Sequence, residues 1–347
     1  LRFEKAHGLT DQQMMQAKEC RLIITRKRPT PEEIERGVYL GIYKARLVCK
    51  DLKCWHKMAP EETYAPVPGL LAFRLIMAAY RSNGFMSRIS TTDFSQAFLQ
   101  ADEYADGLKR LMKYRDVHDK NKFVYAWCKG PIYGEQDACA LWGATRDRVF
   151  IEEMGFERAY NVDSVYINKE QGVITSCHTD DPITVCRDEM AEQWFYQTLA
   201  KHLLIKEVVC LEPNTVIDYL SMRLTISEEG VLRIDNEEKI MEFLEAKGMA
   251  NCNAAQVPLT KKLLTRAVNV NNELLTGEEI TTYQQDVGRF NWLVQTTHPV
   301  LSTSVSIAAS FNNQPTKGCL EMVKHIYRYL QHAKSLCLES DPAIQPV

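Results

Sequence analysis

The fold is decided by residues 173–185, which read Val173-Ile174-Thr175-Ser176-Cys177-His178-Thr179-Asp180-Asp181-Pro182-Ile183-Thr184-Val185. Two β-prone runs flank a polar tetrapeptide, so the pattern predicts an antiparallel pair of strands with Asp180 and Asp181 at the turn. A third carboxylate, Asp93, ends another predicted strand, residues 89–93. Three such carboxylates suit two Mg²⁺ ions at one reaction centre, because Mg²⁺ prefers oxygen ligands and commonly binds substrate phosphates as well.

The neighbouring segments predict a mixture of helices and hairpins. Residues 164–177 read as a hairpin that leads into the Asp-Asp turn, and residues 219–234 read as another. Residues 138–155 and 188–202 have helical patterns, and Thr316 can cap a last helix with an apolar stripe. Helices and antiparallel hairpins in this order predict an α+β fold.

The charge is unevenly distributed along the chain. The 347 residues carry a net charge of −3, yet residues 1–60 hold 13 Lys and Arg against 7 Asp and Glu, a net of +6. A basic region beside an acidic one suits a polyanionic ligand held by one lobe and metal ions held by the other. The alternative is a solvated basic face. No apolar run is long enough to span a bilayer, and the chain begins at Leu1 without a signal peptide, so we expect a fragment of a longer protein.

The eleven cysteines include no C-x-x-C pair. Cys49, Cys54 and His56 come closest to a metal cluster, but their spacing matches no zinc template. We therefore expect reduced, mostly buried thiols and an intracellular location, either cytoplasmic, in a virus-like particle, or nuclear. Zinc binding is the alternative.

Several ordered motifs resemble one known family, the reverse transcriptases of copia-type LTR retrotransposons. The resemblance covers roughly residues 40–335. It is carried by Tyr43–Val48, Glu62–Val67, Thr92–Leu99, Ile132-Tyr133-Gly134 with Ala138 and Trp142, His178–Asp181, Val257–Leu259, Trp292–Pro299 and Ile326–Leu330.

The resemblance implies roles for the acidic residues and for one lysine. Asp93 and Asp180 would bridge two Mg²⁺ ions, for which Mn²⁺ can substitute, and Asp181 would be a weaker ligand. Lys206 is a candidate for protonating the leaving pyrophosphate. For Asp93, the alternative is a helix N-cap ahead of residues 94–99.

The resemblance also implies a nucleotide site. Phe98 would act as a steric gate against the 2′-hydroxyl, unless it is a core aromatic. Lys44 and Arg46 would contact the triphosphate, unless they are solubilising charges on an edge strand. Tyr133 and Gly134 would let the template or the incoming base approach the backbone closely.

Some positions depart from the family pattern. His178 replaces the usual Tyr of the hairpin, where it and Thr179 would lie beside the primer terminus, and Pro182 removes one backbone donor from the returning strand. Gln136 and Asp137 stand where the family has Lys-Gln, which predicts the loss of a basic group next to the nucleotide.

The resemblance implies a right-hand polymerase. Its fingers would be residues 1–87 with 103–135, its palm 88–102 with 136–234, and its thumb and connection 235–347, with ribonuclease H absent. It would be a magnesium-dependent RNA-directed DNA polymerase that takes an RNA template, a DNA primer and dNTPs, from a parent polyprotein in which a ribonuclease H and an integrase are expected. The alternatives are an inactive reverse-transcriptase-like module that binds nucleic acid or acts as a scaffold, and template-free nucleotidyl transfer.

Overall fold

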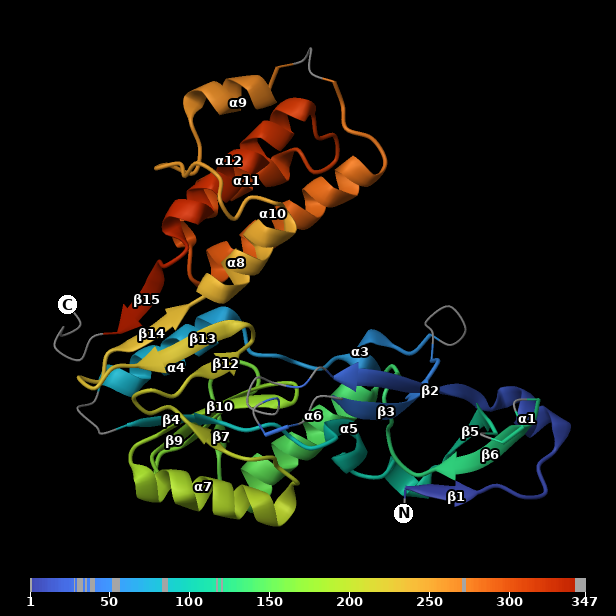
Figure 1. Ribbon diagram of the computed structural model, residues 1–347. Coiled ribbons are helices and arrows are strands. Elements are labelled where there is room, and N and C mark those ends of the chain that lie inside the picture. The colour runs from blue at the N-terminus through green and yellow to red at the C-terminus, as the bar shows by residue number, and fades with distance from the viewer. Residues whose placement is uncertain are drawn as a thin grey trace. The chain divides into compact units, whose positions relative to one another are not determined.

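Helices and strands are mixed along the chain, as the α+β pattern predicts (Figure 1). The computed structural model describes residues 2–27, 29, 34, 36–37, 41–51, 57–82, 87–116, 118–119, 121–269 and 273–340. Cys54 and His56, which belong to the alternative prediction of a zinc site, lie outside the described residues. The chain forms two compact units, a first unit of Leu1–Gly69 with Thr92–Val208 and a second unit of Leu70–Thr91 with Val209–Val347.

A five-stranded sheet occupies one part of the first unit. The order of its strands is β1 (Phe3–Lys5), β6 (Phe123–Cys128), β5 (Arg110–Arg115), β2 (Lys18–Lys27) and β3 (Ile42–Cys49). Only the β2–β5 pair is parallel, and β3 is an edge strand. Short helices among the described residues of this unit are α1 (Asp11–Gln16), which contacts β5, α3 (Pro60–Thr63), which contacts the helix over residues 138–148, and η1 (Ala105–Gly107).

The hairpins predicted around the Asp-Asp turn lie in another sheet of the first unit. The strand order is β10 (Asp181–Cys186), β9 (Val173–His178), β8 (Val165–Asn168) and β7 (Glu157–Arg158), and all neighbours are antiparallel. His178 pairs with Asp181, so Thr179 and Asp180 form a two-residue turn. Thr179 has a φ of 59°, as tight hairpin turns of this length require. The predicted position of the Asp-Asp pair at the turn is confirmed.

Helices pack against the hairpin sheet and enclose its core. They are α5 (Ala97–Gln100), α6 (Ala138–Arg148), a π-helical turn η2 (Val149–Glu153) and α7 (Glu189–His202). The predicted helix over 138–155 therefore ends its regular part at Arg148. Trp142 of α6 and Phe195 of α7 are buried in one apolar cluster with residues of β8, β9 and β10. Asp188 caps α7 by accepting the Ala191 amide, 2.8 Å away.

The second unit has its own sheet and its own core (Figure 1). Its strands are β12 (Ile217–Tyr219), β13 (Met222–Ile226), β14 (Leu232–Asp235) and β15 (Cys337–Ser340), in that order, with β11 (Val209–Cys210) paired to β4 (Arg88–Thr91). Its helices are α4 (Leu70–Ser82), α8 (Glu237–Ala246), α9 (Lys261–Ala267), α10 (Glu278–Thr296), η3 (Pro299–Leu301), α11 (Ser302–Ser310) and α12 (Lys317–Ala333).

Thr316 caps α12 as predicted, because its side chain accepts the Cys319 amide. Among the described residues, we find no helix with the length and apolar character needed to cross a membrane.

Candidate active site

Hydrogen bonds to backbone carbonyls join the three chain segments that carry the predicted catalytic groups. The Lys206 amide donates to the Asp93 carbonyl at 2.9 Å, and the Thr92 hydroxyl donates to the Lys206 carbonyl at 3.0 Å. The Phe94 amide donates to the Asp180 carbonyl at 3.2 Å. These bonds bring Asp93, Asp180 and Lys206 together although they are far apart in sequence.

The side chains at this junction form a cluster of opposite charges. The Lys206 ammonium forms an ion pair with the Asp93 carboxylate. Burial raises the pKa of the Asp181 carboxyl, and the negative charges of Asp180 and Asp93 raise it further. The three predicted metal ligands therefore share one electrostatic environment. Asp93 is not a helix cap, because the N-cap position of α5 is Gln96.

A cavity of about 480 Å³ opens at this junction. Six of the residues predicted for the site line it: Lys44, Arg46, Asp93, Tyr133, Asp180 and Lys206. Phe98, Gly134, His178, Thr179 and Asp181 are not part of its lining. The cavity thus has cations from β3 and from residue 206, and carboxylates from two other segments.

Tyr133 lies between a cation and another aromatic ring. The guanidinium carbon of Arg46 is 5.7 Å from the centroid of the Tyr133 ring, and the Phe98 ring meets it edge-on at 5.2 Å. Phe98 is half-buried and packs against the core between α6 and α7. Lys44 and Arg46 line the cavity and also stand on the edge strand β3, so their position agrees with either prediction and the contact with a triphosphate stays a prediction.

The turn that carries Tyr133 is held tightly against β3. The Cys49 amide donates to the Tyr133 carbonyl at 2.7 Å. Gly134 has a φ of 87°, and a Cβ atom added there would lie 2.2 Å from the Cys49 carbonyl oxygen. At Gly134 the close backbone approach is made by β3 of this chain, whereas the prediction for this position was an approach by the template or the incoming base, which stays a prediction.

A buried ionic network that no sequence motif indicated supports this turn. The Glu135 carboxylate accepts hydrogen bonds from the Ile132 amide at 3.0 Å, the Tyr104 hydroxyl at 2.7 Å and the Arg110 guanidinium at 2.8 Å. Arg110 also bonds both oxygens of Asp137. Asp137 is buried in this network and does not line the cavity. The sequence around Asp137 does not predict this position, because its partner Arg110 is remote in sequence.

The Asp-Asp turn has two further contacts from α6. The Trp142 indole N–H donates to the Thr179 carbonyl at 2.9 Å, and the Arg146 guanidinium donates to the same oxygen at 3.1 Å. Trp142 belonged to the motifs that carry the family resemblance, whereas nothing in the local sequence marked Arg146.

The carboxylates fit magnesium by their chemistry, since hard oxygen donors are what this ion prefers. Among the described residues, however, no three His, Cys, Asp or Glu side chains are already grouped as a metal site. The Asp93 carboxylate is instead engaged by Lys206.

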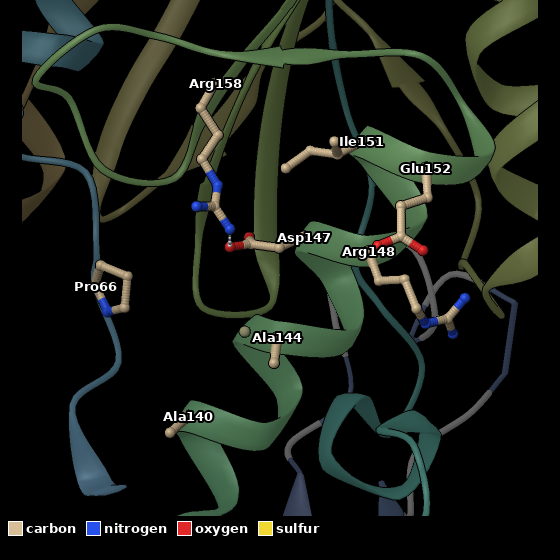
Figure 2. Close-up of a pocket in the computed structure, with 9 residues that line it drawn as sticks. Pro66, Ala140, Ala144, Asp147, Arg148, Ile151, Glu152 and Arg158 are labelled. Atoms are coloured by element: carbon tan, nitrogen blue, oxygen red, sulfur yellow. Dashed lines mark hydrogen bonds and ion pairs between the residues drawn. The ribbon is translucent and has the colours of Figure 1, made fainter. Parts of the chain in front are cut away.

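A separate cavity of about 360 Å³ lies beside α6 and contains no residue predicted for the site (Figure 2). Small side chains of α6 leave it open, and Arg158 reaches across to form an ion pair with Asp147 (Figure 2). Its lining is Pro66, Ala140, Gly143, Ala144, Asp147, Arg148, Ile151, Glu152 and Arg158.

Comparison with known proteins identifies the class. Residues 30–261 match the family model described as reverse transcriptase (RNA-dependent DNA polymerase), so the chain belongs to that family. Within it, the chain is of the copia type, as its motifs indicated.

Three transposon proteins illustrate the relationship. The chain is 24% identical over 316 residues to the retrovirus-related Pol polyprotein from transposon TNT 1-94 of Nicotiana tabacum, covering 87% of this chain and 23% of that protein. It is 23% identical over 318 residues to the corresponding polyprotein from transposon RE1 of Arabidopsis thaliana, covering 90% and 20%. It is 22% identical over 227 residues to a putative transposon Ty5-1 protein of Saccharomyces cerevisiae, covering 64% and 70%. The chain thus spans only about a quarter or less of the length of the two polyproteins.

Solved structures of telomerase are also similar to the chain. Telomerase from Candida albicans, in complex with a fragment of telomeric RNA, matches with a TM-score of 0.42 and 10% identity, covering 95% of this chain and 62% of that one. The apo telomerase from Candida tropicalis, truncated from its C-terminal domain, matches with a TM-score of 0.38 and 7% identity, covering 64% and 55%.

Proposed function

We propose that this chain is the polymerase part of a copia-type reverse transcriptase, which extends a DNA primer on an RNA or DNA template with dNTPs. The observation that carries the proposal is the charge arrangement of the 480 Å³ cavity. Asp93 and Asp180 line one side, where metal ions and a primer terminus need negative charge, and Lys44 and Arg46 supply cations for a triphosphate.

In this proposal Asp93 and Asp180 would hold two Mg²⁺ ions, or Mn²⁺ in their place, with Asp181 as a weaker ligand. When bound, the ions lower the pKa of the primer 3′-hydroxyl and neutralise the triphosphate and the leaving pyrophosphate. Asp93 would exchange its ion pair with Lys206 for metal ligation. Lys206 is then free to donate a proton to the pyrophosphate.

The aromatic and cationic residues orient the nucleotide. Lys44 provides a compact charge for the triphosphate, and Arg46 provides a fork that can bond two oxygens while it stacks on Tyr133. Phe98 supports Tyr133 edge-on and would press against the sugar, which would exclude a 2′-hydroxyl. His178 and Thr179 would lie beside the primer terminus.

We assign the fingers to residues 1–87 with 103–135, the palm to 88–102 with 136–234, and the thumb and connection to 235–347. Binding of the primer–template duplex would depend on phosphate contacts and duplex shape, not on sequence. A ribonuclease H and an integrase would act with this chain in a parent polyprotein.

A second candidate function is an inactive reverse-transcriptase-like module that binds nucleic acid or serves as a scaffold. Two observations favour it. The family tyrosine of the hairpin is replaced by His178, and the Asp93 carboxylate is occupied by Lys206.

Primer extension tests both candidates. With oligo(dT) on poly(rA), dTTP and Mg²⁺ or Mn²⁺, we expect extension by the wild type and a loss of about 100-fold or more in Asp180→Asn, because a charge at the reacting centre is removed. The control is Asp218→Asn, an exposed aspartate of β12, which should extend like the wild type.

Two other outcomes are informative. A wild-type chain that binds the hybrid in a salt-sensitive manner without extending it would contradict the polymerase proposal and favour the inactive module. Incorporation that persists without poly(rA) would indicate template-free transfer.

A further inference from the structure

The backbone of the Asp-Asp turn adopts a conformation that needs support from outside the hairpin. Thr179 has a φ of 59°, in the left-handed region that β-branched residues rarely occupy. Asp180 follows directly, so the orientation of the Thr179 peptide determines where the Asp180 side chain begins. A turn of this kind can relax unless its surroundings hold it.

Helix α6 supplies two hydrogen bonds to this one peptide. Trp142 and Arg146, one helical turn apart, both donate to the Thr179 carbonyl, at 2.9 and 3.1 Å. Both side chains are almost fully buried, with 1% and 2% exposure. Hydrogen bonds in such a dry environment are strong, and an unmade one there is costly.

Each of the three guanidinium nitrogens of Arg146 donates a hydrogen bond. Besides the Thr179 carbonyl, it donates to the Ser164 hydroxyl at 2.8 Å and to the Tyr166 hydroxyl at 3.3 Å, and it forms a long ion pair with Asp147 at 3.8 Å. Burying a charged group is expensive even when it is paired. An apolar side chain of similar volume would avoid this cost, so we interpret the hydrogen bonds that Arg146 donates as its role in the fold.

We propose that Arg146, assisted by Trp142, is a positioning residue that holds the Thr179 peptide and thereby sets the Asp180 carboxylate at the reacting centre. This inference rests on the proposed polymerase function and deepens it. Arg146 does not touch the cavity and acts only through the turn.

Three variants and one control test it: Arg146→Met, Arg146→Lys, Trp142→Phe and Arg148→Met. The methionine keeps an unbranched side chain and removes every hydrogen-bond donor. The lysine keeps the charge and an ammonium group that can donate to the Thr179 carbonyl. Arg148 lies on the same helix but forms ion pairs with Asp102 at 2.9 Å and Glu153 at 3.2 Å, away from the turn.

In primer extension, we expect Arg146→Met to lower kcat about 100-fold, because a small displacement of a reacting group has effects of that size. The KM for dTTP should change less than about 3-fold, since Lys44, Arg46 and Tyr133 are untouched. The kcat of Arg146→Lys should be higher than that of Arg146→Met. The kcat of Trp142→Phe should lie between those of Arg146→Met and wild type, and the kcat of Arg148→Met should equal that of wild type.

Amide hydrogen exchange supplies a readout that needs no activity. Exchange of the amides of residues 178–181 should accelerate about 5-fold or more in Arg146→Met, as expected for the loss of a buried hydrogen bond, while α10 and α12 exchange as in wild type. Should Arg146→Met fail to fold, Arg146→Lys and Trp142→Phe are compared in the same way.

Wild-type kcat together with wild-type exchange at the amides of residues 178–181 in the folded Arg146 variants would overturn the proposal. So would a uniform acceleration of exchange over both units, which would indicate a general loss of stability. If the wild type itself extends no primer, the polymerase proposal fails, and the exchange pattern alone decides whether Arg146 holds the turn.

Discussion

Gly134 shows at the scale of one residue how closely the turn that carries Tyr133 packs against β3. Its φ of 87° is unfavourable for any residue with a Cβ, by about 1–2 kcal/mol. A Cβ there would also lie 2.7 Å from Val48 Cγ1 and 2.2 Å from the Cys49 carbonyl oxygen. We therefore expect Gly134→Ala to lower the free energy of unfolding by more than 1–2 kcal/mol, about the cost of the backbone alone, and to raise the KM for dTTP, because Tyr133 must move.

The matched control is Gly8→Ala. Gly8 has a φ of 64° but nothing within 4 Å of an added Cβ, so it reports the backbone cost without a clash. Urea unfolding of both variants separates the two effects. Equal losses of stability, with an unchanged KM in Gly134→Ala, would contradict the close approach to β3.

At the scale of an element, α12 depends on the residue that caps its start. The Thr316 side chain accepts the Cys319 amide at 3.3 Å and satisfies one of the free donors at the helix start. We expect Thr316→Ala to cost about 1 kcal/mol in urea unfolding and Thr316→Ser to cost much less.

Thr303→Ala serves as the control, because Thr303 is exposed on α11, where alanine has the higher helix propensity. A cost at Thr303 equal to that at Thr316 would show that capping is not the cause.

At the scale of the whole molecule, His298 makes stability depend on pH. It is fully buried and bonded through one ring nitrogen to the Thr297 hydroxyl at 2.8 Å and through the other to the Ala333 carbonyl at 2.9 Å. Burial lowers the pKa of His298 below its usual 6.5. The unfolded chain therefore binds a proton more readily, and stability falls as pH drops below about 6.5, by at most about 1.4 kcal/mol per pH unit for one proton.

Urea unfolding from pH 8 to pH 5 measures this dependence. We expect the curve of His298→Gln to be flatter than that of wild type over this window. His325→Gln is the comparison, because burial lowers the pKa of that half-buried histidine too, and its effect should be smaller. Parallel curves for wild type and His298→Gln would contradict the assignment.

Local patterns accounted for much of the fold. The hairpins around residues 164–186 follow from alternating β-prone residues and turn signals, α7 follows from its helical pattern, and α12 follows from its cap and apolar stripe. Helix α10 was not predicted, because its buried face includes Asp286 and Thr296. Asp286 is buried only because Lys247, Arg289 and Tyr327 provide partners, two of which are remote in sequence.

The family, the α+β pattern and the carboxylates at the hairpin turn could be predicted from residue types and short spacings alone. The structure was needed to show that Asp93 pairs with Lys206, that Asp137 is buried with Arg110, and that Arg146 donates to the Thr179 carbonyl. These contacts could not be predicted locally, because a polar group takes its partners from the fold and each partner here comes from a segment distant in sequence.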